Sequence, residues 1–443
     1  MSGDVSSASD ASPPEPGAAL DCADIVVGVP TYNNARTIAH VVRAIHTGLC
    51  KYFPQFSAVI VNSDGGSTDD TRDILMSSRV GGVPILMLST PMFPVHRLSL
   101  PYHGIPGKGS AFRLIFQMAE KLRASACIVI DADLRSVTPE WVDLLLRPII
   151  YAGYDLVTPH YHRHKYDGTI TSSIVYPLTR ALYGRRVRQP IGGDFGVSGR
   201  LISRYLQRGD WDDNVARYDV DLWMTTIAVA EGYRVCQSFL GENIHATRDP
   251  GADLSTMLQQ VVGSVFSLMQ EYENVWLARS GSESVDLFGF RRDAALDQIP
   301  INLPRMLQAF QRGCAELGEV WEMALTDDTL RKVRRLVADS HFHMNDDLWA
   351  RVIYDFACAY KERPLERGHL LRSLAPLYLG RLASFMIETQ DLYSAGVDEK
   401  IEQLCVTFED LKPYLISRWT GRKPAEPQNR TKMGQELGVE VKS

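Results

Sequence analysis

Short apolar runs alternate with stretches of helical periodicity along the first half of the chain. Residues 25–29 are apolar and mostly β-branched, residues 30–34 have turn chemistry, and apolar side chains between 38 and 45 recur at helical spacing. The same plan repeats with the apolar run 58–62, which a glycine-rich turn and a polar helix start within 63–71 follow. Two strand–turn–helix units in succession predict an α/β fold with a parallel, doubly wound sheet.

A third apolar run, 126–130, leads directly into the tripeptide Asp131-Ala132-Asp133. An Asp-x-Asp tripeptide alone is more often a solvated turn, but carboxylates at the end of a buried strand suit Mg²⁺ or Mn²⁺ beside a pyrophosphate. Ligands of doubly wound sheets bind outside the carboxyl ends of the strands, where residues 30–33, Asp64 and this tripeptide all fall. We therefore expect three turns to converge on one crevice.

From residue 253 onward the chain changes to helical periodicity. Apolar residues between 254 and 269 fall on one stripe. Further helical patterns follow at 303–317, 329–337, 346–360 and 370–388. These patterns predict a disordered tail at 1–20, a catalytic α/β domain at 21–250, a helical domain at 251–420 and a disordered tail at 421–443. For the helical domain, packing and oligomer contact are favoured over a lid that binds the acceptor.

The composition agrees with a soluble enzyme whose partners are small molecules. The 443 residues are 45% hydrophobic, and their formal charge of -6 offers no basic stripe for nucleic acid or an anionic membrane. Seven scattered cysteines without a Cys-x-x-Cys pair indicate reduced thiols and argue against zinc. No uninterrupted apolar run approaches the roughly 18 residues of a spanning helix. We expect a cytoplasmic protein that forms a homo-oligomer.

Four motifs follow one another in the first third of the chain. They are Val-Pro-Thr-Tyr-Asn-Asn at 29–34, Ser-Asp-Gly-Gly-Ser-Thr-Asp-Asp-Thr at 63–71, Pro-Gly-Lys-Gly at 106–109 and Asp-Ala-Asp at 131–133. Their order resembles that of nucleotide-diphospho-sugar glycosyltransferases of the GT-A fold, a Rossmann-like α/β domain. Gln-Pro-Ile-Gly-Gly-Asp at 189–194 and Asn-Ile-His-Ala-Thr-Arg at 243–248 are similar to the retaining mannosylglycerate and glucosyl-3-phosphoglycerate synthases, and those mannosylglycerate enzymes also carry a helical C-terminal region.

This resemblance implies a nucleoside diphosphate sugar as the donor and Mg²⁺ or Mn²⁺ as the cofactor. Lys108, between two glycines, would bring a point charge to the pyrophosphate. Asp133 and His245 would bind the metal, because the synthases place a metal-binding histidine at the matching position. The donor-binding residues would be Pro30, Tyr32, Asn33, Asp64, Lys108, Asp131 and Ala132.

The acceptor implied by the resemblance is a glycerate. Gly192 and Gly193 would let main-chain N–H groups approach its carboxylate, and Thr171 matches an acceptor-binding threonine of both families. Arg248 would pair with the same carboxylate in bidentate fashion. The candidates for catalytic contacts with sugar hydroxyls are Asp194 and Asp221.

Two departures from the families bear on the acceptor. Thr169 stands where the phosphoglycerate enzymes carry an arginine. His164 stands where the mannosylglycerate enzymes carry an arginine. The first departure favours an unphosphorylated acceptor, although the basic residues 162–165 could compensate. We therefore expect metal-dependent, retaining transfer of a hexose, with glucose favoured, to D-glycerate to make glucosylglycerate, a compatible solute. The alternatives are mannosylglycerate or glucosyl-3-phosphoglycerate synthesis, an inverting family-2 transferase, and a non-catalytic nucleotide-sugar sensor.

Overall fold

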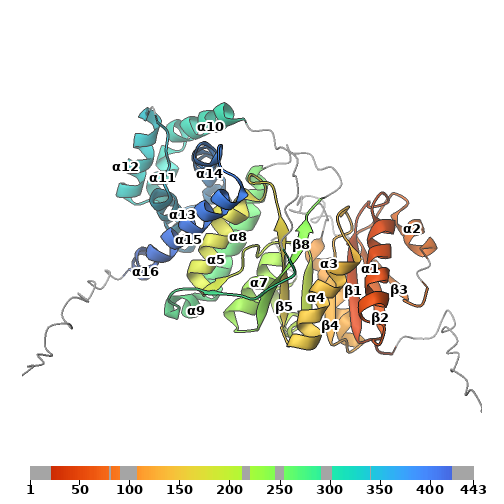
Figure 1. Ribbon diagram of the computed structural model, residues 1–443. Helices are drawn as coiled ribbons and strands as arrows, with labels where there is room; N and C mark the ends of the chain where they lie inside the picture. Colours follow the sequence, from red (N-terminus) through yellow and green to blue (C-terminus); the bar gives the residue numbers. More distant parts are fainter. Residues whose placement is uncertain are drawn as a thin grey trace, which may run out of the picture.

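A central β-sheet organises the computed structural model, which describes residues 21–78, 81–89, 107–211, 220–244, 254–290, 302–339 and 341–421. The strands of this sheet are β1 (Ile25–Thr31), β2 (Ala58–Asp64), β3 (Ile85–Ser89), β4 (Ala126–Val129), β5 (Leu156–His162), β7 (Phe195–Ser198), β8 (Val235–Glu242) and β10 (Leu287–Phe288). Their order across the sheet is β10-β8-β5-β7-β4-β1-β2-β3 (Figure 1). The short strands β6 (Arg185–Arg186) and β9 (Glu283–Ser284) pair with each other.

One strand of the sheet runs opposite to its neighbours. β7 pairs antiparallel with β4 and β5, whereas the other pairings in the sheet are parallel. The α/β fold is therefore confirmed, but the expectation of an entirely parallel sheet was wrong. Phe195 lies opposite Val129 at the carboxyl end of β4. Because β7 begins at the edge where β4 ends, the preceding residue, Asp194, lies beside the Asp131 turn.

Helices cover both faces of the sheet. Those of the first half are α1 (Ile38–Tyr52), α2 (Thr71–Ser77), α3 (Lys108–Lys121), α4 (Pro139–Ala152), α5 (Tyr176–Tyr183), α6 (Gly199–Leu206) and α7 (Val220–Ala230). Alternate residues of β1 enter two different cores. Ile25, Val27 and Val29 belong to the core that α1 and α4 cover, and Val26 belongs to the core on the side of α3.

The second half of the chain is mostly helical and lies at the end of the molecule away from β2 and β3 (Figure 1). Its helices are α8 (Leu254–Glu271), α9 (Glu273–Ala278), α10 (Leu303–Glu316), α11 (Gly318–Ala324), α12 (Asp327–Arg335), α13 (Asp346–Glu362), α14 (Arg367–Thr389), α15 (Ser394–Asp410) and α16 (Lys412–Thr420). The helical patterns predicted after residue 253 are confirmed. One core runs from Phe112 of α3 to Trp349 of α13 and Trp419 of α16, and β10 returns to the sheet edge beside β8.

Arg180 joins α5 to α15. Its side chain is 2% exposed, and its guanidinium lies 2.5 Å from Oε2 of Glu402 and 2.9 Å from Oε1 of Glu409. The hydroxyl of Tyr176 donates a hydrogen bond of 2.9 Å to Glu402. A guanidinium buried this deeply needs paired carboxylates, since an uncompensated charge would be costly. α15 is therefore held against the sheet half in one orientation.

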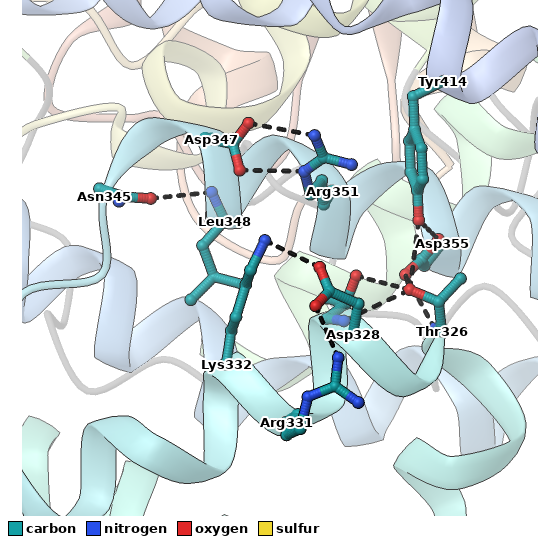
Figure 2. A network of polar contacts seen from close by, with 11 residues as sticks. Thr326, Asp328, Arg331, Lys332, Asn345, Asp347, Leu348, Arg351, Asp355 and Tyr414 are labelled. Carbon is teal, nitrogen blue, oxygen red and sulfur yellow. Dashed lines mark hydrogen bonds and ion pairs between the residues drawn. The ribbon is translucent and has the colours of Figure 1, made fainter.

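A buried acid joins three helices of the helical half (Figure 2). Asp355 of α13 is fully buried and accepts a hydrogen bond of 2.6 Å from the hydroxyl of Tyr414 on α16. Its other oxygen accepts the main-chain N–H of Thr326 at 3.0 Å. Thr326 is the N-cap of α12, where its side chain accepts from the N–H of Thr329. One carboxylate thus fixes the start of α12 and the position of α16.

Among the described helices, α14 is the one with the length and apolar content of a membrane span. Its most apolar 18-residue window has a mean hydropathy of 1.2, and 72% of that window is buried inside the fold. α14 packs against α8, α10 and α13. Such burial is that of a central core helix.

Candidate active site

The turns after β1 and β2 are tied to each other by hydrogen bonds. Asn33 has a φ of 54°, donates its N–H to Oγ of Ser67 at 2.9 Å, and accepts the N–H of Thr68 at 2.8 Å. Asp64, buried at the end of β2, accepts from the hydroxyls of Thr31 at 3.1 Å and Ser67 at 2.6 Å. Asn33 and Asp64 therefore shape the rim of the crevice, and their binding of a nucleotide base stays a prediction.

The other positions predicted to bind the donor, in the first and third turns, lie at the same sheet edge. Pro30 is buried within β1, and half-buried Tyr32 donates its N–H to Oδ1 of Asn34 at 2.7 Å. The carbonyl of Ala132 accepts the hydroxyl of Thr37 at 2.6 Å, which links the Asp131 turn to the start of α1. The predicted convergence of three turns is confirmed.

A buried lysine lies between two buried carboxylates at this edge. Gly107 caps α3 in a left-handed conformation, and Lys108 begins the helix with a side chain that is 7% exposed. The Nζ of Lys108 is 3.4 Å from Oδ1 of Asp131 and 3.4 Å from Oδ2 of Asp221. The start of α3, the turn after β4 and the first turn of α7 thus meet, and we call Lys108, Asp131, Asp194 and Asp221 the lysine cluster.

The glycine pair before β7 closes around this cluster. Gly193 has a φ of 89° and donates its N–H to Oδ2 of Asp221 at 2.9 Å. A Cβ at Gly193 would lie 2.4 Å from Oδ2 of Asp131, and one at Gly192 would lie 2.0 Å from Cγ of Pro159. Only glycine fits either position. The anion that faces the Gly193 amide in this structure is Asp221, so contact of that amide with an acceptor stays a prediction.

Asp194 connects the cluster to β5. Its Oδ1 accepts the main-chain N–H of Asp131 at 2.8 Å, and its Oδ2 accepts the hydroxyl of Tyr161. Burial raises the pKa of Asp194 well above its ordinary value, and the adjacent Asp131 carboxylate adds to this shift. A protonated Asp194 would lower the negative charge of the cluster.

The Asp133 turn is joined to the segment that precedes position 245. The N–H of Arg135 donates to the carbonyl of Ile244 at 2.9 Å, and the N–H of Ile244 donates to Oγ of Ser136 at 3.1 Å. Asp133 is half-buried in this turn. His245 and Arg248 lie outside the described residues. Within those residues, no three His, Cys, Asp or Glu side chains are close enough to hold a metal by themselves.

A pocket lined by several polar and charged side chains lies next to the lysine cluster. It is formed by the end of β5, the loop 163–168, the residues Gln189 and Ile191, and one side of α15. Thr171, at the start of the π-helix Thr171–Val175, also lines it. We call this the arginine pocket, because Arg163 and Arg188 are among the residues that line it.

The cations of the arginine pocket differ in how they are engaged. The side chain of Arg163 is 18% exposed, its Nη1 lies 3.7 Å from Asp167, and its guanidinium stacks over the ring of Tyr161. Lys165 instead donates three hydrogen bonds of 2.9 to 3.2 Å to carbonyls at the end of α14, which uses all three of its protons. Of Arg163 and Lys165, only Arg163 therefore keeps donors for a ligand.

Sequence reasoning missed several residues of this site. Tyr161, Arg188 and Asp398 belong to no motif of the sequence. The Gln189 side chain pairs with the main chain of Tyr161 through bonds of 3.1 and 2.9 Å, which was also not foreseen. Thr169, at the position of the families' arginine, bonds the hydroxyl of Tyr378 at 2.5 Å and faces α14.

Comparisons with known proteins give similarity only at the level of solved structures. No protein-family model matches the chain, and no curated protein matches it. The chain is similar to glucosyl-3-phosphoglycerate synthase from Mycobacterium tuberculosis in complex with Mn²⁺, UDP and phosphoglyceric acid, at 23% identity and a TM-score of 0.41, over 56% of this chain and 78% of that one. The complex of that synthase with Mg²⁺ and UDP matches at 23% identity and 0.40, over 57% and 84%.

A third structure of the synthase contains Mn²⁺, UDP-glucose and phosphoglyceric acid. It matches at 21% identity with a TM-score of 0.40, over 58% of this chain and 85% of that one. A likeness of this size carries no argument for activity. The function proposed below therefore rests on the residues of this chain.

Proposed function

We propose that the protein is a metal-dependent, retaining glycosyltransferase that moves a hexose, with glucose favoured, from a nucleoside diphosphate sugar to D-glycerate. The observation that carries the proposal is the place of Tyr161. Its side chain lines the arginine pocket, and its hydroxyl bonds Asp194 of the lysine cluster. Transfer between two small molecules needs two binding compartments that share a wall, so that the reacting atoms are held close together.

The lysine cluster supports a diphosphate on the donor side. Lys108 begins α3, where the main-chain N–H groups of the first turn and the helix dipole favour an anion. A bound diphosphate would compete with Asp131 and Asp221 for the Lys108 ammonium, and it would leave Asp131 able to accept from sugar hydroxyls. The ammonium would then stabilise the charge that develops on the departing diphosphate.

The residues near Asp133 fit a divalent ion that binds together with the donor. Ile244, the residue before His245 in the sequence, is bonded to Arg135 and Ser136 of the Asp133 turn. A carboxylate and an imidazole from His245, completed by phosphate oxygens, suit Mn²⁺ and to a lesser degree Mg²⁺. When bound, the ion would supply Lewis-acid neutralisation of the leaving diphosphate.

The arginine pocket supports a small hydroxy acid as the acceptor. Arg163 and Arg188 offer planar donors for a carboxylate, and Thr171 offers a hydroxyl. In a retaining transfer by front-face attack, an oxygen of the leaving diphosphate takes the acceptor proton, and no carboxylate base is required. An inverting enzyme would need such a base on the opposite face of the sugar.

The test is product formation by the purified protein. UDP-glucose, GDP-glucose and GDP-mannose are each incubated with Mn²⁺ and either D-glycerate or 3-phosphoglycerate, and the products are identified by mass spectrometry. The signal of the anomeric proton in the NMR spectrum should show an α-linked product from an α-linked donor. Lys108→Ala should lower kcat/KM by at least about a hundredfold, while Lys51→Ala, at an exposed lysine, should not.

The outcomes separate the competing functions. A β-linked product would identify an inverting transferase. Donor binding without product for every acceptor would identify a nucleotide-sugar sensor. Failure of all three donors to bind would overturn the proposal.

A further inference from the structure

The helical half of the chain supplies one wall of the arginine pocket. Ser394, Val397, Asp398 and Ile401 of α15 line it together with the loop after β5. Val397 and Ile401 are buried, and the buried ion pairs of Arg180 hold α15 against α5. This wall is therefore a fixed part of the pocket, built by residues far from the sheet in sequence.

Arg188 faces that wall. Its main-chain N–H donates to Oε1 of Gln237 at 2.6 Å, and its guanidinium lies over the ring of Tyr176, 5.3 Å from the ring centre. The Nη2 of Arg188 is 3.6 Å from Oδ1 of Asp398, with the two side chains 19% and 44% exposed. At this separation the two groups form an ion pair without a hydrogen bond. The guanidinium is thus fixed by stacking and keeps donors for a ligand, while Asp398 offsets its charge.

The pocket carries a small positive balance of charge. Arg163, Lys165 and Arg188 line it together with the carboxylates of Asp167 and Asp398. Burial and the neighbouring Lys165 lower the pKa of His164. Among the arginine, lysine and aspartate side chains of the lining, three cations and two carboxylates leave one positive charge. A single carboxylate balances this charge, whereas a carboxylate and a phosphate monoester together bring nearly three negative charges.

We propose that Asp398 is a specificity-determining residue that restricts the pocket to acceptors with one anionic group. This inference rests on the proposed function and deepens it. Asp398 partly neutralises Arg188 and places a negative charge where a second anionic group of the acceptor would lie. Both effects weaken the binding of a phosphorylated hydroxy acid, and neither weakens the binding of an unphosphorylated one.

The test compares two acceptors across variants of one residue. Asp398→Asn should raise the ratio of kcat/KM for 3-phosphoglycerate to that for D-glycerate about tenfold, because it removes one nearby like charge. Asp398→Glu keeps the charge and should keep the wild-type ratio. The matched control is Glu399→Gln, which removes an exposed charge from the same helix and should also leave the ratio unchanged.

Two results would overturn the inference. The first is an unchanged ratio in Asp398→Asn, and the second is an equal change in Glu399→Gln, which would show a general effect of net charge. Folding is checked by circular dichroism and by the urea midpoint, which the Asp398→Asn variant should share with the wild type.

A direct binding measurement separates this inference from the proposed function. If the wild-type protein forms no product, the proposed function fails, and calorimetric titration with D-glycerate and 3-phosphoglycerate still decides the role of Asp398. Tighter binding of 3-phosphoglycerate to Asp398→Asn than to the wild type supports the inference. Equal binding of 3-phosphoglycerate to both proteins, or none to either, refutes it.

Discussion

The hydroxyl of Tyr161 donates a hydrogen bond to Oδ2 of Asp194, so a wall residue of the arginine pocket holds a carboxyl group of the lysine cluster. The same hydroxyl lies 3.1 Å from the carbonyl of Gly192. The other oxygen of Asp194 accepts the main-chain N–H of Asp131. The position of the Asp131 turn is therefore coupled to the wall of the neighbouring pocket through two hydrogen bonds.

Tyr161→Phe removes this coupling and keeps the ring that stacks on Arg163. We expect kcat to fall about tenfold, since Asp194 loses the donor that orients it, with a loss of about 1–2 kcal/mol in unfolding free energy. The KM for D-glycerate should change by less than about threefold. Steady-state kinetics and urea denaturation measure these effects. Tyr151→Phe, at an exposed tyrosine, is the control, and an unaltered kcat in Tyr161→Phe would contradict the coupling.

Removal of the divalent ion should abolish transfer. EDTA should stop product formation, and Mn²⁺ or Mg²⁺ should restore it. Asp133→Ala should be folded but inactive, and it should lose the Mn²⁺ binding that water-proton relaxation detects in the presence of UDP. Asp143→Ala, which removes a carboxylate paired with Arg147 on α4, should retain both properties. Full activity in EDTA would refute the metal assignment.

The unfolding free energy should depend on pH through Lys412. Its ammonium is buried and donates to the carbonyls of Leu182 at 3.1 Å and Arg279 at 2.7 Å. Burial lowers the pKa of Lys412 from 10.5 to about 8, and Arg279 adds to this effect. Because the folded state releases this proton at a lower pH than the unfolded chain does, the unfolding free energy rises with pH between about 8 and 10.5, and this contribution levels off below about 8, where both states hold the proton.

Lys412→Met removes this contribution. The unfolding free energy of the wild type minus that of the variant should increase between pH 7 and pH 10, by on the order of 3 kcal/mol. Urea denaturation at four pH values measures the difference. Lys51→Met should show no such trend, and a difference that is independent of pH for Lys412→Met would contradict the prediction.

Asp355→Ala should destabilise the helical half. It leaves the hydroxyl of Tyr414 and the N–H of Thr326 without their buried acceptor, and it removes the carboxylate 3.4 Å from Nε of Arg418. The expected loss is about 3 kcal/mol of unfolding free energy. Asp328→Ala, at an exposed acid nearby (Figure 2), should leave the urea midpoint unchanged. An equal effect of both substitutions would show that burial of Asp355 is not the cause.

Local patterns in the sequence were sufficient for much of the sheet and for the edge that carries the candidate site. The apolar runs at β1, β2 and β4 and the turns that follow them lie as predicted, because strand periodicity and turn chemistry are local properties. The direction of β7 is not such a property. A four-residue strand, Phe195–Ser198, has the same composition whether it runs parallel or antiparallel, so its reversal depends on packing that the sequence pattern does not reveal.

The two walls of the arginine pocket show the same limit. Arg188 and Asp398 are separated by more than two hundred residues, and Asp398 has the pattern of an ordinary surface acid on an amphipathic helix.

The prediction for Gly193 was right in part. Its sequence context predicted an anion at its amide, and the anion found there is Asp221 of the protein itself.

The core that passes without a break from Phe112 to Trp419 joins the sheet half of the protein to its helical half. A fragment that ended at residue 250 would expose to water the apolar side chains that α8 and α13 now cover, and it would aggregate rather than retain half of the activity. Substitutions in α13 and α16, whose described residues do not line the arginine pocket, would accordingly change how much protein a cell accumulates. The rate constants of the molecules that do fold would stay the same.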